Sequence, residues 1–175
     1  MRVGVWALGT DRPGIVAAIT GAIVDAGGNL ADTSMTILSG QFAMVLIVDD
    51  VVSLEDLEAR VARAGAPLGI TTSARALNDA HGTDDNGIAC VVSVHGADRP
   101  GIVHAFATRL AELNANITDV RTHLIGDAAS PVYTMLLETE LPDGVAISNV
   151  DDAVRALGAQ LGVDAHAHGV DEDVL

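Results

Sequence analysis

An octapeptide that occurs twice sets the architecture of this 175-residue chain. GTDRPGIV at positions 9–16 recurs as GADRPGIV at 96–103, 87 positions later. Because twice 87 is 174, two copies account for the whole chain. Ten of the 24 positions from 9 to 32 are identical in the second copy. Stacked repeat arrays need three or more copies, so two copies of this length predict two small domains.

Hydrophobic periodicity gives both copies the same order of elements: strand, helix, strand, strand, helix, strand. A hairpin turn is expected at Ser39-Gly40 and a helix N-cap at Ser53. The order predicts an α+β fold of two ferredoxin-like βαββαβ domains, each an antiparallel four-stranded sheet with two helices on one face. The expected strands are 2–8, 29–38, 41–49, 68–77, 87–95, 116–126, 131–140 and 162–170, and the expected helices are 13–27, 54–64, 100–113 and 147–160.

Composition places the domain boundaries between these elements. The segment 79–86 is polar and poor in apolar residues, so it is predicted to be a linker. We therefore expect a first domain over 1–78, a second over 87–170 and an acidic tail over 171–175.

Charge and hydropathy exclude several classes of function. All nine basic residues are Arg, and 24 acidic residues bring the formal net charge to −15. Such a surface should repel a polyanion, so direct nucleic-acid binding is not expected. The longest apolar run, 42–48, is too short to span a membrane. No signal-peptide pattern opens the sequence, and we expect a cytoplasmic protein.

The duplicated motif lies between an expected strand and an expected helix. Pro13 suits the first helical position, and Gly14 would leave the first helical turn without a side chain. The unpaired N–H groups of such a turn attract an anion. Asp11 adds an acceptor beside these donors, and Asp98, Pro100 and Gly101 repeat the arrangement. Donors for a carboxylate beside an acceptor for an ammonium group predict a zwitterion as the ligand.

Simpler interpretations of the same residues stay open at this point. Asp11 and Asp98 could be helix caps, because an Asp side chain before a helix accepts hydrogen bonds from the first turn. Asn29 and Asn116, which open the second strand of each copy, could be turn residues that tolerate left-handed geometry. If they are functional, the fold should bring them near the motif loop of their own copy or of a neighbouring copy.

The element order, the Asp-Arg-Pro-Gly-Ile-Val motif and the Asn-(Leu/Ile)-x-Asp entry into the second strand resemble ACT domains, and the resemblance covers nearly the full chain. The tandem pair without a catalytic domain looks most like the glycine cleavage system transcriptional repressor group. The resemblance implies amino-acid binding at interfaces between paired domains and signalling to a partner protein. It implies these ligand-binding residues: Asp11, Arg12, Pro13, Gly14, Ile15, Asn29, Asp98, Arg99, Pro100, Gly101, Ile102 and Asn116.

The two copies differ before the Asn, where Gly27-Gly28 in the first corresponds to Asn114-Ala115 in the second. Their pockets need not be equivalent, and one could be empty. Edge strands that can pair make a homodimer the expected assembly.

Other candidate chemistry is weak. Two His in one strand, His166 and His168, should share a face, but no third ligand accompanies them, so no metal site and no cofactor are expected. His95 and His104 flank only the second motif. Cys90 is expected to be a buried strand residue, since no activating base lies near it in the sequence. The strand residues Met35, Met44 and Met135 are expected in the core.

These observations favour a regulatory protein without catalytic activity that senses a small amino acid, with glycine or serine as first guesses, and that acts on a partner protein. Any effect on DNA would be indirect, through that partner. The alternatives are a protein-interaction scaffold with degenerate ligand sites and a small enzyme subunit, which would need a general acid or base in a cleft.

Overall fold

The computed structural model describes residues 1–78, 87–125 and 132–170. The chain divides into two compact units, Met1–His81 and Gly82–Leu175. We call their described parts the first module and the second module. The predicted linker and the predicted acidic tail lie outside the described residues.

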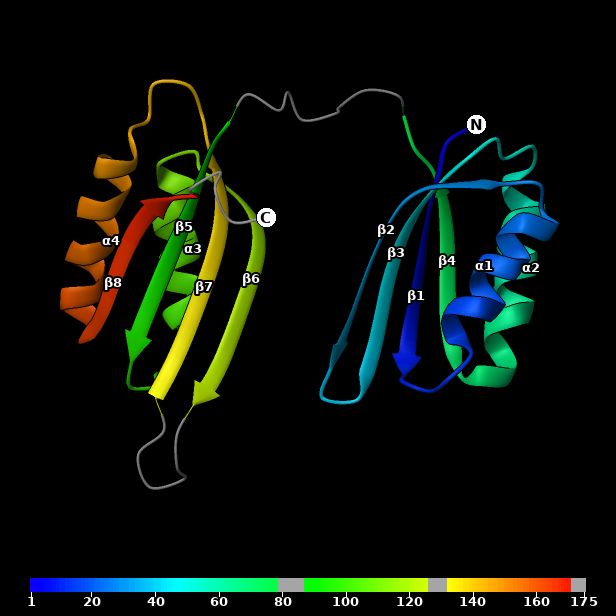
Figure 1. Ribbon diagram of the computed structural model, residues 1–175, viewed down its shortest axis with the longest axis horizontal. Coiled ribbons are helices and arrows are strands. Elements are labelled where there is room, and N and C mark those ends of the chain that lie inside the picture. Colours follow the sequence, from blue (N-terminus) through cyan, green and yellow to red (C-terminus); the bar gives the residue numbers. More distant parts are fainter. Residues whose placement is uncertain (79–86, 126–131, 171–175) are drawn as a thin grey trace. The chain divides into compact units, whose positions relative to one another are not determined.

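The first module has the predicted order of elements (Figure 1). A short 3-10 turn, Ala66–Leu68, separates its second helix from its last strand. The elements are β1 (Val3–Thr10), α1 (Ile15–Asp25), β2 (Asn29–Leu38), β3 (Gln41–Asp49), α2 (Leu54–Gly65) and β4 (Ile70–Ala76).

The second module repeats this order, and its sheet has the equivalent strand sequence. The strands run β2-β3-β1-β4 in the first sheet and β6-β7-β5-β8 in the second, with antiparallel neighbours throughout. This confirms the predicted ferredoxin-like fold of both copies. The elements are β5 (Ile88–Gly96), α3 (Ile102–Glu112), β6 (Asn116–Ile125), β7 (Val132–Leu141), α4 (Ile147–Leu161) and β8 (Val163–Gly169).

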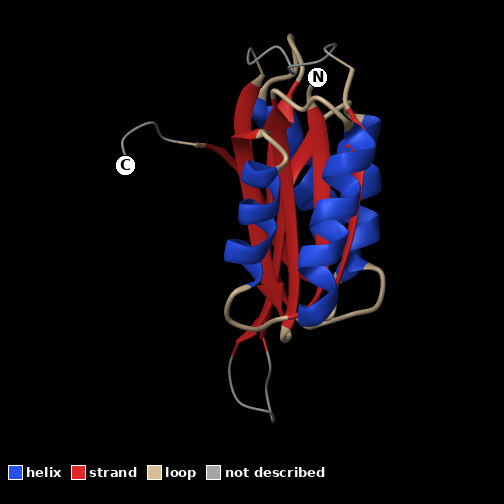
Figure 2. Cartoon of the chain, turned by 90° about the vertical axis from the view of Figure 1, so that its right-hand side faces the viewer, coloured by secondary structure: helices blue, strands red, loops and turns tan. Residues whose placement is uncertain are grey.

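Each sheet buries one face beneath its two helices, and in Figure 2 the helices of the first module lie in front of its strands. Strand residues alternate between this face and the helix-free face, as the period of a strand requires. In β1, Val3, Val5 and Ala7 are buried. The core of the first module also takes Ile19 from α1 and Leu57 from α2.

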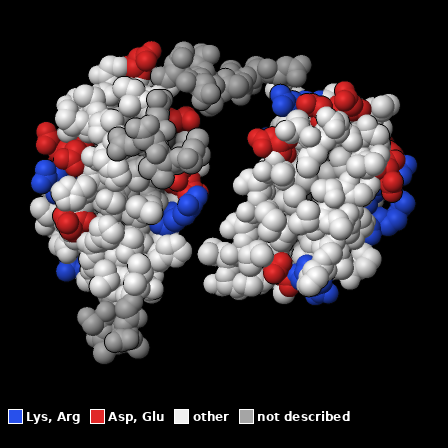
Figure 3. All heavy atoms as spheres, viewed as in Figure 1, with Lys and Arg blue, Asp and Glu red and all other residues white. Residues whose placement is uncertain are grey.

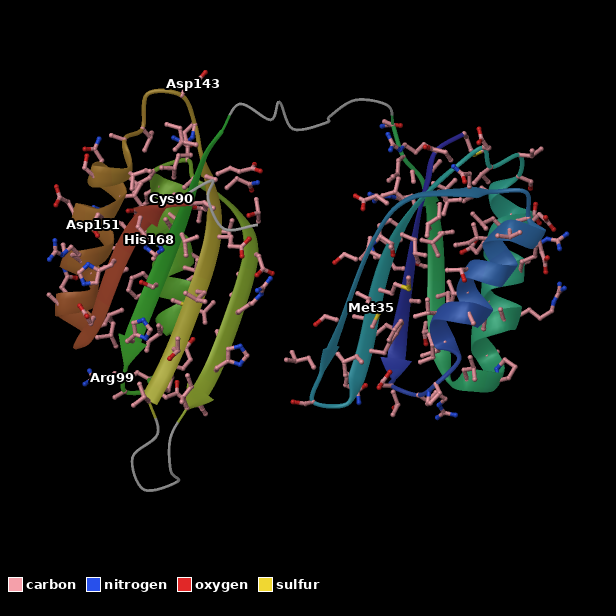
Figure 4. All side chains as sticks on the ribbon, in the orientation of Figure 1. Met35, Cys90, Arg99, Asp143, Asp151 and His168 are labelled. Atoms are coloured by element: carbon pink, nitrogen blue, oxygen red, sulfur yellow. The ribbon has the colours of Figure 1, made fainter. Side chains whose placement is uncertain are left out.

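The central strands carry the core, and the edge strands β2 and β6 do not. All ten residues of β2 are exposed, and Met35 on this strand is 46% exposed (Figure 4). The prediction that Met35 is a core residue is therefore wrong, because its strand lies at the sheet edge beyond the helices. Met44 and Met135, on the neighbouring strands β3 and β7, are buried as predicted.

Local signals for the turns and caps are confirmed. Ser39 and Gly40 both have positive φ, 51° and 77°, which is the geometry of a two-residue hairpin turn. The Ser53 hydroxyl accepts a hydrogen bond from the Asp56 N–H at 3.2 Å and caps α2. Among the described residues, no helix is both long and apolar enough to cross a membrane.

Candidate functional site

The two motif loops have the same backbone geometry, which differs from the expected one. Helix α1 begins at Ile15, and Gly14 precedes it as the N-cap with a left-handed φ of 96°. Gly101 does the same before α3, with φ 90°. Pro13 therefore lies before the helix and not at its first position, because the chain reaches the helix through a left-handed residue. A Cβ on either glycine would meet no atom within 4 Å, so the glycines are needed for their φ.

Neither helix start has a side-chain cap. No side chain accepts a hydrogen bond from the first turn of α1 or α3, so the capping interpretation of Asp11 and Asp98 is wrong. The first bond of α1 runs from the Ala18 N–H to the Gly14 carbonyl at 2.9 Å. The N–H groups of Val16 and Ala17 thus have no acceptor among the described residues, as the anion-binding interpretation requires.

A hydrogen bond ties the first motif loop to the tip of the β2–β3 hairpin. The Asp11 N–H donates to the Gly40 carbonyl at 2.9 Å. The Asp11 side chain itself is exposed, three residues before the N-cap of α1. The contact with Gly40 adds the hairpin tip to the surroundings of the candidate site, which sequence reasoning did not foresee.

Arg99 lies at the C-terminal end of α4, and Arg12 lies near the residue that ends the 3-10 turn after α2. A Cβ built on Gly162, the left-handed residue that ends α4, would lie 3.3 Å from an Arg99 guanidinium nitrogen (Figure 4). The same construction on Gly69 gives 4.0 Å to Arg12. A cation is favourable at a helix C-terminus, so this placement gives Arg99 a structural role.

The isoleucines of the motif belong to the cores. Ile15 is 1% exposed and Ile102 is 3% exposed. Their side chains therefore cannot reach a ligand at the loop surface, and the Ile102 N–H already donates to the Arg99 carbonyl at 3.4 Å.

The asparagines do not lie at the motif loop of their own module. Asn29 pairs with Asp49, whose neighbour Val48 pairs with Val3 at the start of β1. The motif loop follows Thr10, at the opposite end of β1. Asn116 has the equivalent place in the second sheet, where it pairs with Glu140. Of the two expected arrangements, proximity within one copy is therefore wrong, and proximity to a neighbouring copy stays a prediction.

The sequence difference before Asn29 and Asn116 lies just after the C-terminal end of the preceding helix, α1 or α3. Gly27 and Asn114 occupy the same position after their helices, and both have positive φ, 77° and 54°. Asn tolerates this conformation better than most side chains. The asparagines that open β2 and β6 do not have positive φ, so the left-handed turn interpretation of Asn29 and Asn116 is wrong.

The described surface also has two grooves away from the motif loops. A groove of about 430 Å³ lies between α3 and α4, and His104 is among the residues that line it. An equivalent groove of about 380 Å³ lies between α1 and α2. None of the predicted ligand-binding residues lines either groove.

Titratable groups elsewhere form no recognisable reaction centre among the described residues. There, no three His, Cys, Asp or Glu side chains gather as metal ligands would. The His166 Nε2 lies 3.2 Å from Asp164, and its Nδ1 lies 3.7 Å from Asp151. Cys90 is 1% exposed, and burial raises the pKa of its thiol, opposite to the shift that an activated cysteine needs.

On the face shown in Figure 3, acidic and basic side chains are interspersed.

Comparison with known proteins agrees with the fold and the duplication. The family model of the ACT domain matches residues 3–75 and 89–168. The chain therefore belongs to the ACT domain family, with two copies of the domain. ACT domains are regulatory modules, and this chain is an ACT-domain protein.

Its curated relatives are proteins of about one module. The chain is 40% identical over 72 residues to UPF0237 protein MK1213 of Methanopyrus kandleri. This match covers 39% of this chain and 80% of that protein. It is 34% identical over 71 residues to UPF0237 protein YjhC of Lactococcus lactis, covering 40% of this chain and 82% of that one.

Two solved structures share the fold over both modules. A protein of unknown function from Galdieria sulphuraria has a TM-score of 0.82 at 24% identity and covers 97% of this chain and 98% of its own. A "putative glycine cleavage system transcriptional repressor" has a TM-score of 0.73 at 18% identity and covers 98% of both chains. At these identities the likeness concerns the fold alone.

Proposed function

We propose that the chain is a regulatory protein without catalytic activity that binds a small amino acid at its motif loops and passes the signal to a partner protein. The observation that carries this proposal is the paired geometry of the two loops. Each presents unpaired helix N–H groups, reached through a left-handed glycine, next to an exposed aspartate. The N–H groups suit the carboxylate of an amino acid, and the aspartate suits its ammonium group.

A complete site in this proposal needs a second module. Asn29 lies at the far end of the sheet from its own motif loop, so it can meet a ligand only at the loop of another module. If two β2 strands pair antiparallel, Asn29 of one lies opposite Leu38 of the other. Leu38 pairs with Gln41 beside the hairpin tip, and the tip is bonded to the motif loop. Antiparallel pairing therefore brings Asn29 of one chain to the end of the other chain's sheet where the motif loop lies.

The edge strand has the surface that such pairing requires. Met35 and Ile37 on β2 are 46% and 51% exposed, and Val120 and Leu124 on β6 are 45% and 63% exposed. A long apolar edge strand left in water invites pairing with another chain. Helix α1 also has an exposed apolar residue, Val24, at 69%. We infer a homodimer in which these edges are covered.

Glycine and serine are the first ligands to test. They suit the limited space at a closely approached helix start, and the fold is shared with a protein named for glycine cleavage repression. Because the chain carries a net charge of −15 and has no Lys, we expect any effect on transcription to pass through the partner protein. The cytoplasmic location stays a prediction from the sequence.

A thermal-shift screen of the twenty amino acids tests the proposal. Ligand at 100 times its dissociation constant should stabilise the folded chain by about 2.7 kcal/mol. Asp11→Ala and Asp98→Ala should reduce this response, whereas Asp25→Ala and Asp152→Ala, which change exposed aspartates on helices, should leave it intact. No response to any amino acid would support a scaffold with degenerate sites, and turnover of a hit would support an enzyme.

A further inference from the structure

The two motif loops differ at one residue beneath them. Tyr133 on β7 pairs with Gly96, the last residue of β5 before the second loop. In the first module, Phe42 pairs with Gly9 in the same way. Tyr133 is 8% exposed and Phe42 is 1% exposed, so both rings belong to the cores. The second loop therefore has a phenolic hydroxyl where the first has only a ring edge.

This hydroxyl is available to a ligand. It has no hydrogen-bond partner among the described residues, although the side chain is more than nine-tenths buried. Burial raises the pKa of Tyr133, and the negative charge of Asp98 raises it further. The Asp98 charge thus acts on the phenol, and the pairing of Tyr133 with Gly96 places this residue beside the strand end that leads into the second loop.

Among the described residues, the Thr72 hydroxyl is the buried side-chain oxygen without a partner, so the Tyr133 hydroxyl reaches solvent at the surface of the core, where a ligand can replace its water. The phenol can donate one hydrogen bond and accept another. A second position beside the loops is also more polar in the second module. The exposed residue before the loop is His95 there, and the corresponding residue in the first module is the exposed Leu8. The second loop is therefore the more polar of the two.

We propose that Tyr133 determines selectivity at the second motif loop, which takes an amino acid with a hydroxyl in its side chain, whereas the first loop, with Phe42, takes one without. This inference rests on the proposed function. The natural probes are serine and alanine, because they differ only by the hydroxyl that Tyr133 would contact.

Isothermal titration of the full chain with serine and alanine tests the assignment. Asp11→Ala leaves the second loop as the competent site, and there serine should bind more tightly than alanine. Adding Tyr133→Phe should lower the ratio of serine to alanine affinity by about 3- to 10-fold, the effect of one neutral hydrogen bond. The reciprocal change, Phe42→Tyr in an Asp98→Ala background, should raise that ratio at the first loop. If both changes leave the ratio unaltered, the selectivity inference is overturned and the proposed function stands.

A second readout needs no variant. Tyr133 is the only tyrosine of the chain, so every phenol contribution to the near-ultraviolet absorption comes from this residue. Serine should perturb this absorption more than alanine at equal occupancy, and equal perturbation would contradict direct contact. If neither amino acid binds the unaltered chain, the selectivity inference fails, whereas the proposed function is decided by the screen of the twenty amino acids.

Discussion

Asn29 and Asp11 lie at opposite ends of the same four-stranded sheet. Asn29 opens β2 at the end where β1 begins, whereas Asp11 follows the last residue of β1. Both residues belong to the motifs that the chain shares between its copies, yet one module cannot bring them together. Their separation is the physical reason to expect a ligand site completed by a second module.

Pairing through the edge strand predicts the effect of a charge placed on it. Ile37→Lys should raise the dissociation constant of the dimer about tenfold or more, because an apolar side chain that is buried on pairing contributes up to about 1.5–3 kcal/mol. Sedimentation equilibrium measures the change. Thr71→Lys, an exposed substitution on the opposite edge strand β4, is the control. A dimer unaffected by Ile37→Lys would show that β2 is not the interface.

The left-handed glycine at the helix start predicts opposite effects for two similar substitutions in the first module. Gly14→Ala should destabilise the module by about 1–2 kcal/mol, because an L-residue is strained at φ 96°. Gly21→Ala, inside α1, should stabilise it by about 0.5–1 kcal/mol. Neither position has an atom within 4 Å of the added Cβ, so the substitutions differ chiefly in backbone conformation.

Urea unfolding followed by Trp6 fluorescence checks this pair, because Trp6 is the only tryptophan of the chain and reports on the first module. Equal effects of the two substitutions would show that Gly14 is not left-handed in solution.

The buried thiol predicts slow chemistry at Cys90. It is the only cysteine, it is 1% exposed, and burial raises its pKa. An aromatic disulfide reagent at pH 8 should therefore react only when the second module opens. An opening free energy of about 3 kcal/mol slows the reaction about 100-fold relative to the unfolded chain. Equally fast labelling of the folded chain and of the chain in guanidinium would contradict the burial.

The raised pKa of Tyr133 predicts a loss of stability at alkaline pH. The unfolded phenol loses its proton near pH 10, while the folded phenol keeps it to a higher pH. Within that window the folded chain binds more protons, so the unfolding free energy falls as pH rises. Asp98→Asn removes the nearby negative charge and should lower the pKa of Tyr133 in an absorbance titration. An unchanged titration curve would place Asp98 away from the phenol.

Local sequence signals predicted the fold because each depends on neighbouring residues. Ser39-Gly40 marked the hairpin, and the flanking strands have the predicted bounds, 29–38 and 41–49. The helix start was misplaced, because Pro followed by Gly suits either a first helical turn or a left-handed residue before it. The position of Asn29 relative to Asp11 depends on strand register across the sheet, which no local pattern contains. The effect of the Asp98 charge on Tyr133 is also a long-range relationship, which no local pattern contains.

Calorimetric titration of an unpaired chain tests the dependence of ligand binding on a neighbouring module most directly. In an Asp98→Ala background only the first loop remains competent, and the amino acid found in the screen should bind to it with measurable heat. At a protein concentration where Ile37→Lys leaves the chain monomeric, this substitution should also remove that heat, because Asn29 of the neighbouring module is withdrawn, while Thr71→Lys should preserve both. Undiminished affinity in the Ile37→Lys chain, with the dimer lost, would contradict the account.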